Sequence, residues 1–352
     1  MKNNMVEYFT DDKQKLDLYL DWTPKAKNIV ITSHQNPDGD AFGSALGLWN
    51  YLKKFDFEKV TFISPTDYAD FIAWMPGVSS IVVYDNKNKA LANGLIAEAD
   101  LIFCTDFSSG SRMKDMKDVV LSSSSKKIII DHHEQPETFG DLLYWNEHAS
   151  STCELIYQMI VKLGHEAMID LDIATCLYTG LLTDTGSFKY PATTPEVHNV
   201  AGKLLAKGVV PSAIHRSLFD QNDFEKLQFL GFVLSKKMTY LPEYRVCYTY
   251  ISEKELKKYN SKNGDTEGIV NYGLSIAGSV MSAIFIEKEG LIKISFRSVH
   301  DFSVADLARD YFEGGGHKNA AGGRSSLSLE ETVQKFLTLL PYLKSQLELQ
   351  PN

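Results

Sequence analysis

The stretch Lys126–His133 reads K-K-I-I-I-D-H-H, a short apolar run that ends in a carboxylate and two imidazoles. Three consecutive isoleucines favour a buried β-strand. Adjacent histidines at the end of such a strand are poor packing residues, whereas imidazoles and carboxylates bind protons and metal ions. The stretch therefore predicts a strand of a parallel sheet whose carboxyl end carries a site of chemical function.

The same alternation of short apolar runs and amphipathic stretches extends from about residue 28 to residue 210. It is typical of βαβ units that build a parallel sheet flanked by helices, so we expect an α/β fold. The expected strands are residues 28–33, 60–64, 80–84, 100–104 and 126–130, and the expected helices include 41–52 and 88–99.

The pattern changes after about residue 210. Residues 214–234 predict one long amphipathic helix, and β-like runs follow at 244–251, 282–286 and 291–296. Since 352 residues exceed the size at which one hydrophobic core stops growing, two domains are expected. We predict an N-terminal domain at residues 1–210, a helical connector at 211–235 and a smaller C-terminal α/β domain at 236–345.

The composition argues against several classes of protein. No apolar run approaches the ~20 residues of a membrane span, and the N-terminus lacks the pattern of a secretory signal. The four scattered cysteines form no C-x-x-C pair. We therefore expect a cytoplasmic protein without membrane contact. The net charge of −9 argues against binding of long duplex nucleic acid, which depends on lysine and arginine.

Metal-binding side chains follow three of the expected strands and one expected helix. His34, Asp38 and Asp40 follow the first strand, Asp106 follows residues 100–104, Asp131, His132 and His133 follow residues 126–130, and Asp184 follows the helical stretch 174–183. Because the carboxyl ends of parallel strands meet at one edge of a sheet, we expect these side chains to lie close together.

Each of these clusters has a simpler structural explanation when taken alone. Asn36–Asp40, N-P-D-G-D, has good turn chemistry, and a lone Asp106 or Asp184 is typical of a helix or turn cap. An EF-hand is excluded, because the sixth and twelfth positions counted from residue 36 are Ala41 and Gly47. Four clusters at one sheet edge nevertheless favour a metal site over coincidence.

The mixture of ligands predicts the metal and the chemistry. Several carboxylates with two or three imidazoles and no thiolate suit hard divalent ions, and manganese suits them better than zinc or calcium. One aspartate shared by two ions would hold them about 4 Å apart, where they clamp phosphoryl oxygens and lower the pKa of a shared water. The sequence therefore predicts two divalent cations, Mn²⁺ in preference, and metal-assisted hydrolysis.

A second cluster, Phe312–Gly323, reads F-E-G-G-G-H-K-N-A-A-G-G. It is neither a P-loop nor a dinucleotide fingerprint. Gly314, Gly315 and Gly316 would let backbone amides approach an anion, and His317 and Lys318 would add charge. Arg297, at the end of an expected strand, suits bidentate phosphate contact. The alternative is a glycine-rich turn between a helix and a strand.

Five motifs in this order resemble those of the DHH phosphoesterases that carry a DHHA1 domain. They are His34–Ser44, Cys104–Ser108, Asp131–His133, Leu182–Phe188 and Gly314–Gly322. The resemblance covers nearly the whole chain and is nearest to the stand-alone oligoribonuclease and pAp phosphatase type. It implies an N-terminal DHH domain, which holds the metals, and a C-terminal DHHA1 domain, which binds substrate.

The resemblance also implies a role for each candidate residue. His34 and Asp38 would hold one manganese ion, Asp40, His132 and Asp184 would hold the other, and Asp106 would bridge them. Asp131 would orient a neighbouring group, and His133 would face the scissile phosphate as a catalytic residue. Arg297, His317 and the glycines Gly314, Gly315 and Gly316 would hold the terminal phosphate or nucleotide.

The function implied is a manganese-dependent phosphohydrolase for a small phosphorylated nucleotide or a short single-stranded RNA. It would trim RNA oligomers, remove the 3′-phosphate of pAp, or do both. The alternatives are an exopolyphosphatase and a soluble phosphodiesterase for pApA or cyclic di-AMP. A non-enzymatic nucleotide-binding module is disfavoured because all the expected ligands are present. A homodimer is compatible with this interpretation.

Overall fold

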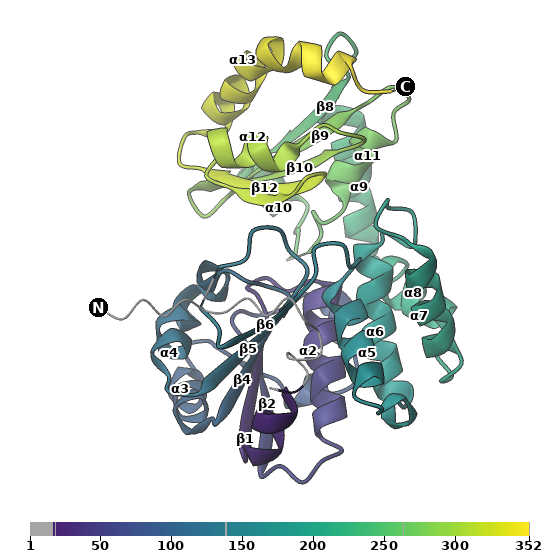
Figure 1. Ribbon diagram of the computed structural model, residues 1–352. Coiled ribbons are helices and arrows are strands. Elements are labelled where there is room, and N and C mark those ends of the chain that lie inside the picture. Colours follow the sequence, from purple (N-terminus) through teal and green to yellow (C-terminus); the bar gives the residue numbers. More distant parts are fainter. Residues whose placement is uncertain (1–16, 18, 138, 263, 352) are drawn as a thin grey trace. The chain divides into compact units, whose positions relative to one another are not determined.

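The structure is a computed structural model that describes residues 17, 19–137, 139–262 and 264–351. The chain divides into two compact units, unit 1 up to Gln221 and unit 2 from Asn222 (Figure 1). In its described residues, each unit contains one six-stranded sheet with helices packed on it. The predicted α/β fold with two sheet-containing domains is confirmed, whereas the boundaries at residues 210 and 235 stay a prediction.

The sheet of unit 1 is wholly parallel and has the strand order β3-β2-β1-β4-β5-β6. Its strands are β1 (Asn28–Thr32), β2 (Lys59–Ser64), β3 (Val82–Val83), β4 (Leu101–Thr105), β5 (Lys126–Asp131) and β6 (Leu142–Trp145). The direction of winding reverses between β1 and β4. In open α/β sheets, ligands bind beyond the carboxyl ends of the strands at such a switch point.

Helices cover both faces of this sheet (Figure 1). One face carries α2 (Gly39–Leu52), α5 (Thr152–Lys162) and α6 (Leu171–Asp184), with α7 (Pro195–Leu205) and α8 (Pro211–Phe219) beyond them. The other face carries α3 (Lys89–Glu98) and α4 (Lys117–Ser122). Two of these helices carry candidate metal ligands at the sheet edge. Asp40 lies in the first turn of α2, and Asp184 is the last residue of α6.

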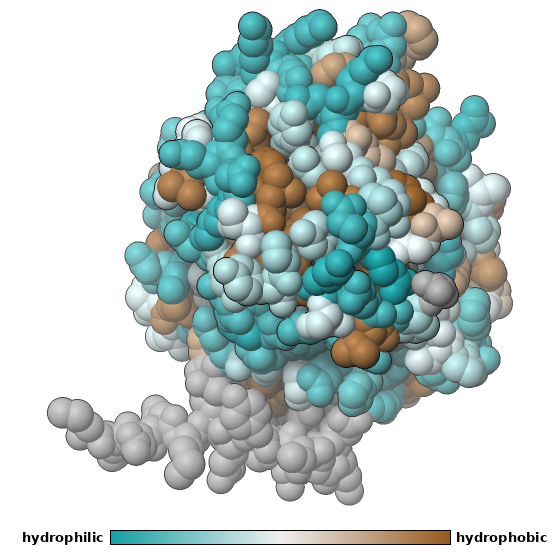
Figure 2. All heavy atoms as spheres, turned by 90° about the horizontal axis from the view of Figure 1, so that it is seen from above, coloured by the Kyte–Doolittle hydropathy of each residue, from teal (hydrophilic) through white to brown (hydrophobic). Residues whose placement is uncertain are grey.

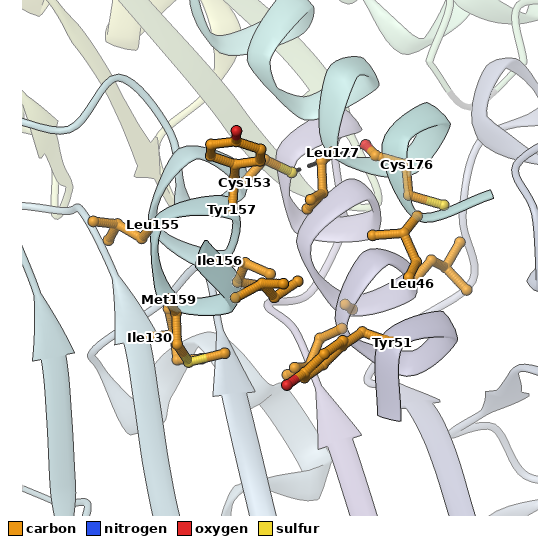
Figure 3. Packing of buried hydrophobic residues seen from close by; sticks show 14 of the residues in the cluster. Leu46, Tyr51, Ile130, Cys153, Leu155, Ile156, Tyr157, Met159, Cys176 and Leu177 are labelled. Atoms are coloured by element: carbon orange, nitrogen blue, oxygen red, sulfur yellow. Dashed lines mark hydrogen bonds between the residues drawn. The ribbon is translucent and has the colours of Figure 1, made fainter. Parts of the chain in front are cut away.

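The three isoleucines of β5 contribute to the core on both faces. Ile128 and Ile130 join the cluster under α2, α5 and α6, and Ile129 joins the cluster under α3 and α4. All three side chains are at most 1% exposed, which confirms the predicted buried strand. Figure 3 shows part of the first cluster, in which Leu46 of α2 and Ile156 of α5 pack in the layer above the strands. This packing fixes the carboxyl end of β5.

Unit 2 has a mixed sheet in the order β11-β12-β10-β9-β8-β7, in which only the β8 and β9 pair is parallel. Its strands are β7 (Met238–Leu241), β8 (Val246–Ile251), β9 (Met281–Lys288), β10 (Leu291–Ser298), β11 (Gly315–His317) and β12 (Ala320–Ser325). Its helices are α9 (Phe224–Lys236), α10 (Glu253–Lys258), α11 (Ile269–Leu274), α12 (Val304–Tyr311) and α13 (Leu329–Glu348). Helices lie on both faces of this sheet too.

Phenylalanines form the centre of unit 2. Phe285, Phe296, Phe312 and Phe336 are each at most 1% exposed and contact one another through their rings. The face seen in Figure 2 is largely hydrophilic, with hydrophobic side chains in small groups. Among the residues that the structure describes, no helix combines the length and the apolar character that a membrane span requires.

One predicted helix between the two sheets is wrong in detail, and one strand of the unit 1 sheet is missing from the prediction. The single helix expected at 214–234 is two helices, α8 and α9. Asp223 starts the second one, because its side chain accepts a hydrogen bond from the amide of Lys226 at 3.2 Å and so caps a new helix. The strand β6 was not predicted, because its four residues are too short to give a periodic signal.

Candidate metal centre

All six predicted metal ligands lie together in unit 1, beyond the carboxyl ends of β1, β4 and β5. They form two groups in which the ligand atoms are within 4.8 Å of one another: His34, Asp38 and Asp106, and Asp40, His132 and Asp184. The groups match the two sets that the family resemblance implied. The switch point between β1 and β4 explains their place, because the loops that leave these two strands diverge there.

Asp106 lies between the two groups. Its Oδ2 is 3.4 Å from Nε2 of His34, and its Oδ1 is 3.5 Å from Nε2 of His132. The residue has a left-handed backbone with φ 67°, and its amide donates to the carbonyl of Ile130. Aspartate tolerates this conformation better than most residues, and such outliers cluster at functional sites. The opposite oxygens of one carboxylate therefore face the two imidazoles.

The main chain sets which nitrogen each imidazole offers. Nδ1 of His34 lies 2.8 Å from the carbonyl oxygen of Gln35, and Nδ1 of His132 lies 3.2 Å from that of Ala149. A carbonyl oxygen only accepts, so Nδ1 donates its proton in both rings. Nε2 is then the atom with a lone pair, and in both residues it faces the carboxylates.

Asp38 and Asp40 also have structural roles, in addition to the turn that the sequence Asn36–Asp40 predicts. Oδ1 of Asp38 accepts from the amides of Asp40 and Ala41 and caps α2, while its Oδ2 lies 3.8 Å from Nε2 of His34. The Asp40 carboxylate accepts from the amides of Thr152 and Cys153 at 2.6 and 2.9 Å, where α5 begins. Helix N-termini thus hold these carboxylates in place without using all their lone pairs.

His133 is held by Asp131. Nδ1 of His133 donates to Oδ1 of Asp131 at 2.8 Å, and the indole of Trp145 donates to the His133 carbonyl at 2.7 Å. Burial raises the pKa of Asp131, but the hydrogen bond and charge of His133 outweigh it and hold that pKa below its usual range. The Asp131 carboxylate is fully buried, and it fixes the orientation of the more exposed His133 ring.

The electrostatics of the cluster fit a cation site. Burial and the neighbouring carboxylates raise the pKa of Asp106 and of Asp40 well above the usual range, and they raise that of Asp184 to about 6. Burial lowers the pKa of His132, but the three adjacent carboxylates outweigh it and raise the pKa. The histidines of the cluster therefore supply too little positive charge to balance its buried carboxylates. Hard divalent cations would supply that charge, and they bind carboxylate oxygens and imidazole nitrogens.

Thr152 is a part of the site that was not predicted. Its hydroxyl donates to Oδ1 of Asp106 at 2.9 Å, and its amide donates to Asp40. One signal in the sequence could have located it. Ser151 precedes α5 and caps it by accepting from the amide of Glu154, so S-T-C-E is a helix-start pattern. The pattern predicts a helix N-terminus but not that its first residue contacts Asp106.

In unit 2, Arg297 and His317 lie on one face of the sheet. Arg297 of β10 pairs with Ala320 of β12, and Ala320 pairs with His317 of β11. Residues opposite each other in antiparallel strands point to the same face. The small Ala320 side chain therefore lies between the two larger ones on one face of the sheet.

The three glycines of the second cluster differ in their surroundings. A Cβ on Gly314 would lie 2.0 Å from the carbonyl oxygen of Gly322, and one on Gly316 would lie 2.6 Å from that of Ala320. Gly315 has nothing within 4 Å of such a Cβ. Close packing against β12 thus explains Gly314 and Gly316, and Gly315 and Gly316 lie in the strand β11 and not in a turn. The Lys318 ammonium is paired with Asp301 at 2.8 Å.

Two known protein families match this chain, one in each of its two units. The DHH family, N-terminal domain, matches residues 28–181, and the DHHA1 domain matches residues 243–343. A bifunctional oligoribonuclease and PAP phosphatase NrnA from Bacillus subtilis is 28% identical, over 84% of this chain and 88% of the relative. The protein of that name from Thermus thermophilus is 29% identical, over 88% of both chains.

One solved structure is similar to this chain over nearly the full length of both proteins. An exopolyphosphatase-related protein from Bacteroides fragilis superposes with a TM-score of 0.91 and is 38% identical, over 96% of this chain and 98% of that one. Both matched domains occur in the order that the motifs predicted. The chain therefore belongs to the DHH family, carries a DHHA1 domain, and is a metal-dependent phosphoesterase.

Proposed function

We propose that the chain is a manganese-dependent phosphohydrolase that cleaves short RNA oligonucleotides and removes the 3′-phosphate of pAp. The observation that carries this proposal is the position of Asp106, whose two oxygens face two separate groups of ligands. The relatives named as oligoribonucleases and PAP phosphatases support the choice of substrate. Short nucleotides also suit a chain with a net charge of −9, which is a poor partner for long nucleic acids.

The six ligands would form two cation sites that share one residue. His34 and Asp38 would hold one divalent cation, Asp40, His132 and Asp184 would hold the second, and Asp106 would be shared. Two such cations lower the pKa of a water and neutralise phosphoryl oxygens. Manganese is preferred because carboxylates outnumber imidazoles and no thiolate takes part. The protein holds these donors through α2, α5 and the carbonyls of Gln35 and Ala149.

His133 would act on the substrate directly. Because its Nδ1 donates to Asp131, its Nε2 is the atom that is available to a phosphate oxygen or to the leaving group. The buried Asp131 carboxylate would stabilise the protonated imidazole, which can then donate to the departing oxygen. In unit 2, Arg297 and His317 would hold a phosphate of the substrate across Ala320.

His317→Ala is expected to weaken substrate binding more than turnover. A hydrogen bond to a charged group contributes about 1.5–3 kcal/mol, so KM for pAp should rise about 10- to 100-fold while kcat changes much less. Steady-state kinetics with manganese measures both constants. Lys293→Ala is the matched control, since Lys293 is an exposed cation on β10 paired with Glu267. Unchanged affinity for every phosphate substrate in the His317 variant would contradict the role of the DHHA1 domain.

The experiment that tests the function compares four substrates under one condition. The purified chain is incubated with manganese and pAp, a short 5′-labelled RNA, pApA or a polyphosphate, and released phosphate or nucleotide is measured. Turnover of pAp and of the short RNA is the expected result. The name of the Bacteroides fragilis neighbour makes exopolyphosphatase activity the second candidate. Turnover confined to polyphosphate would replace the proposal by that activity, and turnover confined to pApA would replace it by a dinucleotide phosphodiesterase.

A further inference from the structure

Arg112 is a cation beside the metal centre that has no role in the function so far. It belongs to the 3₁₀ segment Gly110–Met116, which follows β4 and the loop that contains Asp106. The residue is partly buried. Arginine is costly to bury without an opposite charge, so its position needs an explanation.

Hydrogen bonds at both ends hold the loop that carries Arg112. The Glu137 carboxylate accepts from the Ser109 hydroxyl at 2.7 Å and from the Gly110 amide at 2.9 Å. At the other end, the Arg112 carbonyl accepts from the amide of Gln35 at 2.7 Å. Since the Gln35 carbonyl in turn accepts from His34, the Arg112 main chain is two hydrogen bonds away from a metal ligand. The main chain of Arg112 is thus held next to the first group of ligands.

The charge of Arg112 interacts with His34 and Asp38, which belong to the first group of ligands, but the guanidinium has no direct partner among the described residues. Within the described ranges of the chain, the guanidinium makes no ion pair and no hydrogen bond. Its donors therefore remain available beside a centre that binds phosphates.

We propose that Arg112 is a substrate-binding residue, and that its guanidinium holds a non-bridging oxygen of the phosphoryl group that is hydrolysed. The inference rests on the proposed function and names a further contact for it. A guanidinium gains nothing from nearby metal cations, because like charges repel, whereas a phosphate supplies the opposite charge and matches its planar fork. The contact should strengthen as negative charge builds up on the phosphoryl oxygens in the transition state.

The test compares Arg112→Ala, Arg112→Lys and the wild type on pAp with manganese. Loss of one charged donor at the reacting group should lower kcat/KM about 100- to 1000-fold in the alanine variant. Lysine keeps the charge but loses the fork, so it should recover part of that loss. Arg216→Ala is the matched control, because Arg216 is an exposed arginine of α8 in the same unit. It should leave kcat/KM unchanged.

The amount of manganese bound per chain separates the proposal from a structural role. The main-chain bond to Gln35 survives in every Arg112 variant, so each should bind as much manganese as the wild type. Loss of metal in proportion to activity would overturn the proposal, as would a kcat/KM within twofold of the wild type. Failure of the proposed function is distinct, because the wild type itself would then be inactive on pAp. In that case the same ratios are measured on whichever of the four phosphate substrates the wild type cleaves.

Discussion

Asp106→Ala is expected to abolish hydrolysis while the chain stays folded. The proposal makes Asp106 the residue shared by both cation sites, so its loss should remove the stabilisation of charge at the phosphoryl group. That stabilisation amounts to several kcal/mol, and the expected fall in kcat is at least about 1000-fold. Phosphate release from pAp with manganese measures the loss, and manganese bound per chain should drop below that of the wild type.

The folded state should tolerate this change. Burial and the carboxylates of Asp38, Asp184 and Asp131 raise the pKa of Asp106, which means that its charge is unfavourable in the metal-free protein. Removing it relieves that repulsion, which offsets the strain of alanine at a left-handed position and the lost hydrogen bond from Thr152, so the metal-free variant should still unfold cooperatively in urea. Asp118→Ala is the control, an exposed aspartate in the first turn of α4. Near-normal turnover of the Asp106 variant would refute the shared-ligand assignment.

The sequence was sufficient to predict the sheet edge at which the ligands meet. Apolar runs before Asp106 and before Asp131 predict parallel strands, and the carboxyl ends of such strands lie at one edge. The faces of the sheet could also be predicted, because alternate isoleucines of β5 must point to opposite sides. The grouping of the ligands into two sets came from the family resemblance, and the structure places those sets together.

The contacts that support the ligands could not be predicted. Thr152, Gln35 and Arg112 reach the ligands through hydrogen bonds between loops or through charge, and nothing in their local sequence predicts these contacts. The strand order that places β4 beside β1 is likewise a tertiary property. Local sequence predicts the type of an element, whereas its neighbours depend on how the whole core packs.

The close approach of α2 and α6 is a further tertiary property, and it depends on Gly180. Asp184 lies at the end of α6, and Asp40 lies near the start of α2. The distance between these two helices therefore sets the distance between the two ligands. A Cβ on Gly180 would lie 2.2 Å from Sγ of Cys153, 2.6 Å from Oδ1 of Asp40 and 3.0 Å from the Asp40 Cα. One of these atoms is backbone, so a side-chain rotation alone cannot make room.

Gly180→Ala is therefore expected to force α2 and α6 apart. Overpacking of a tight core costs about 1–3 kcal/mol, and the urea midpoint should fall accordingly. Because Asp40 must move, manganese affinity should fall as well. Gly202→Ala is the matched control, since it places the same methyl group on an exposed helix position with nothing within 4 Å. There alanine should stabilise the helix by about 0.5–1 kcal/mol. If both variants unfolded at the wild-type midpoint and bound manganese equally, the contact between α2 and α6 would not set the geometry of the ligands.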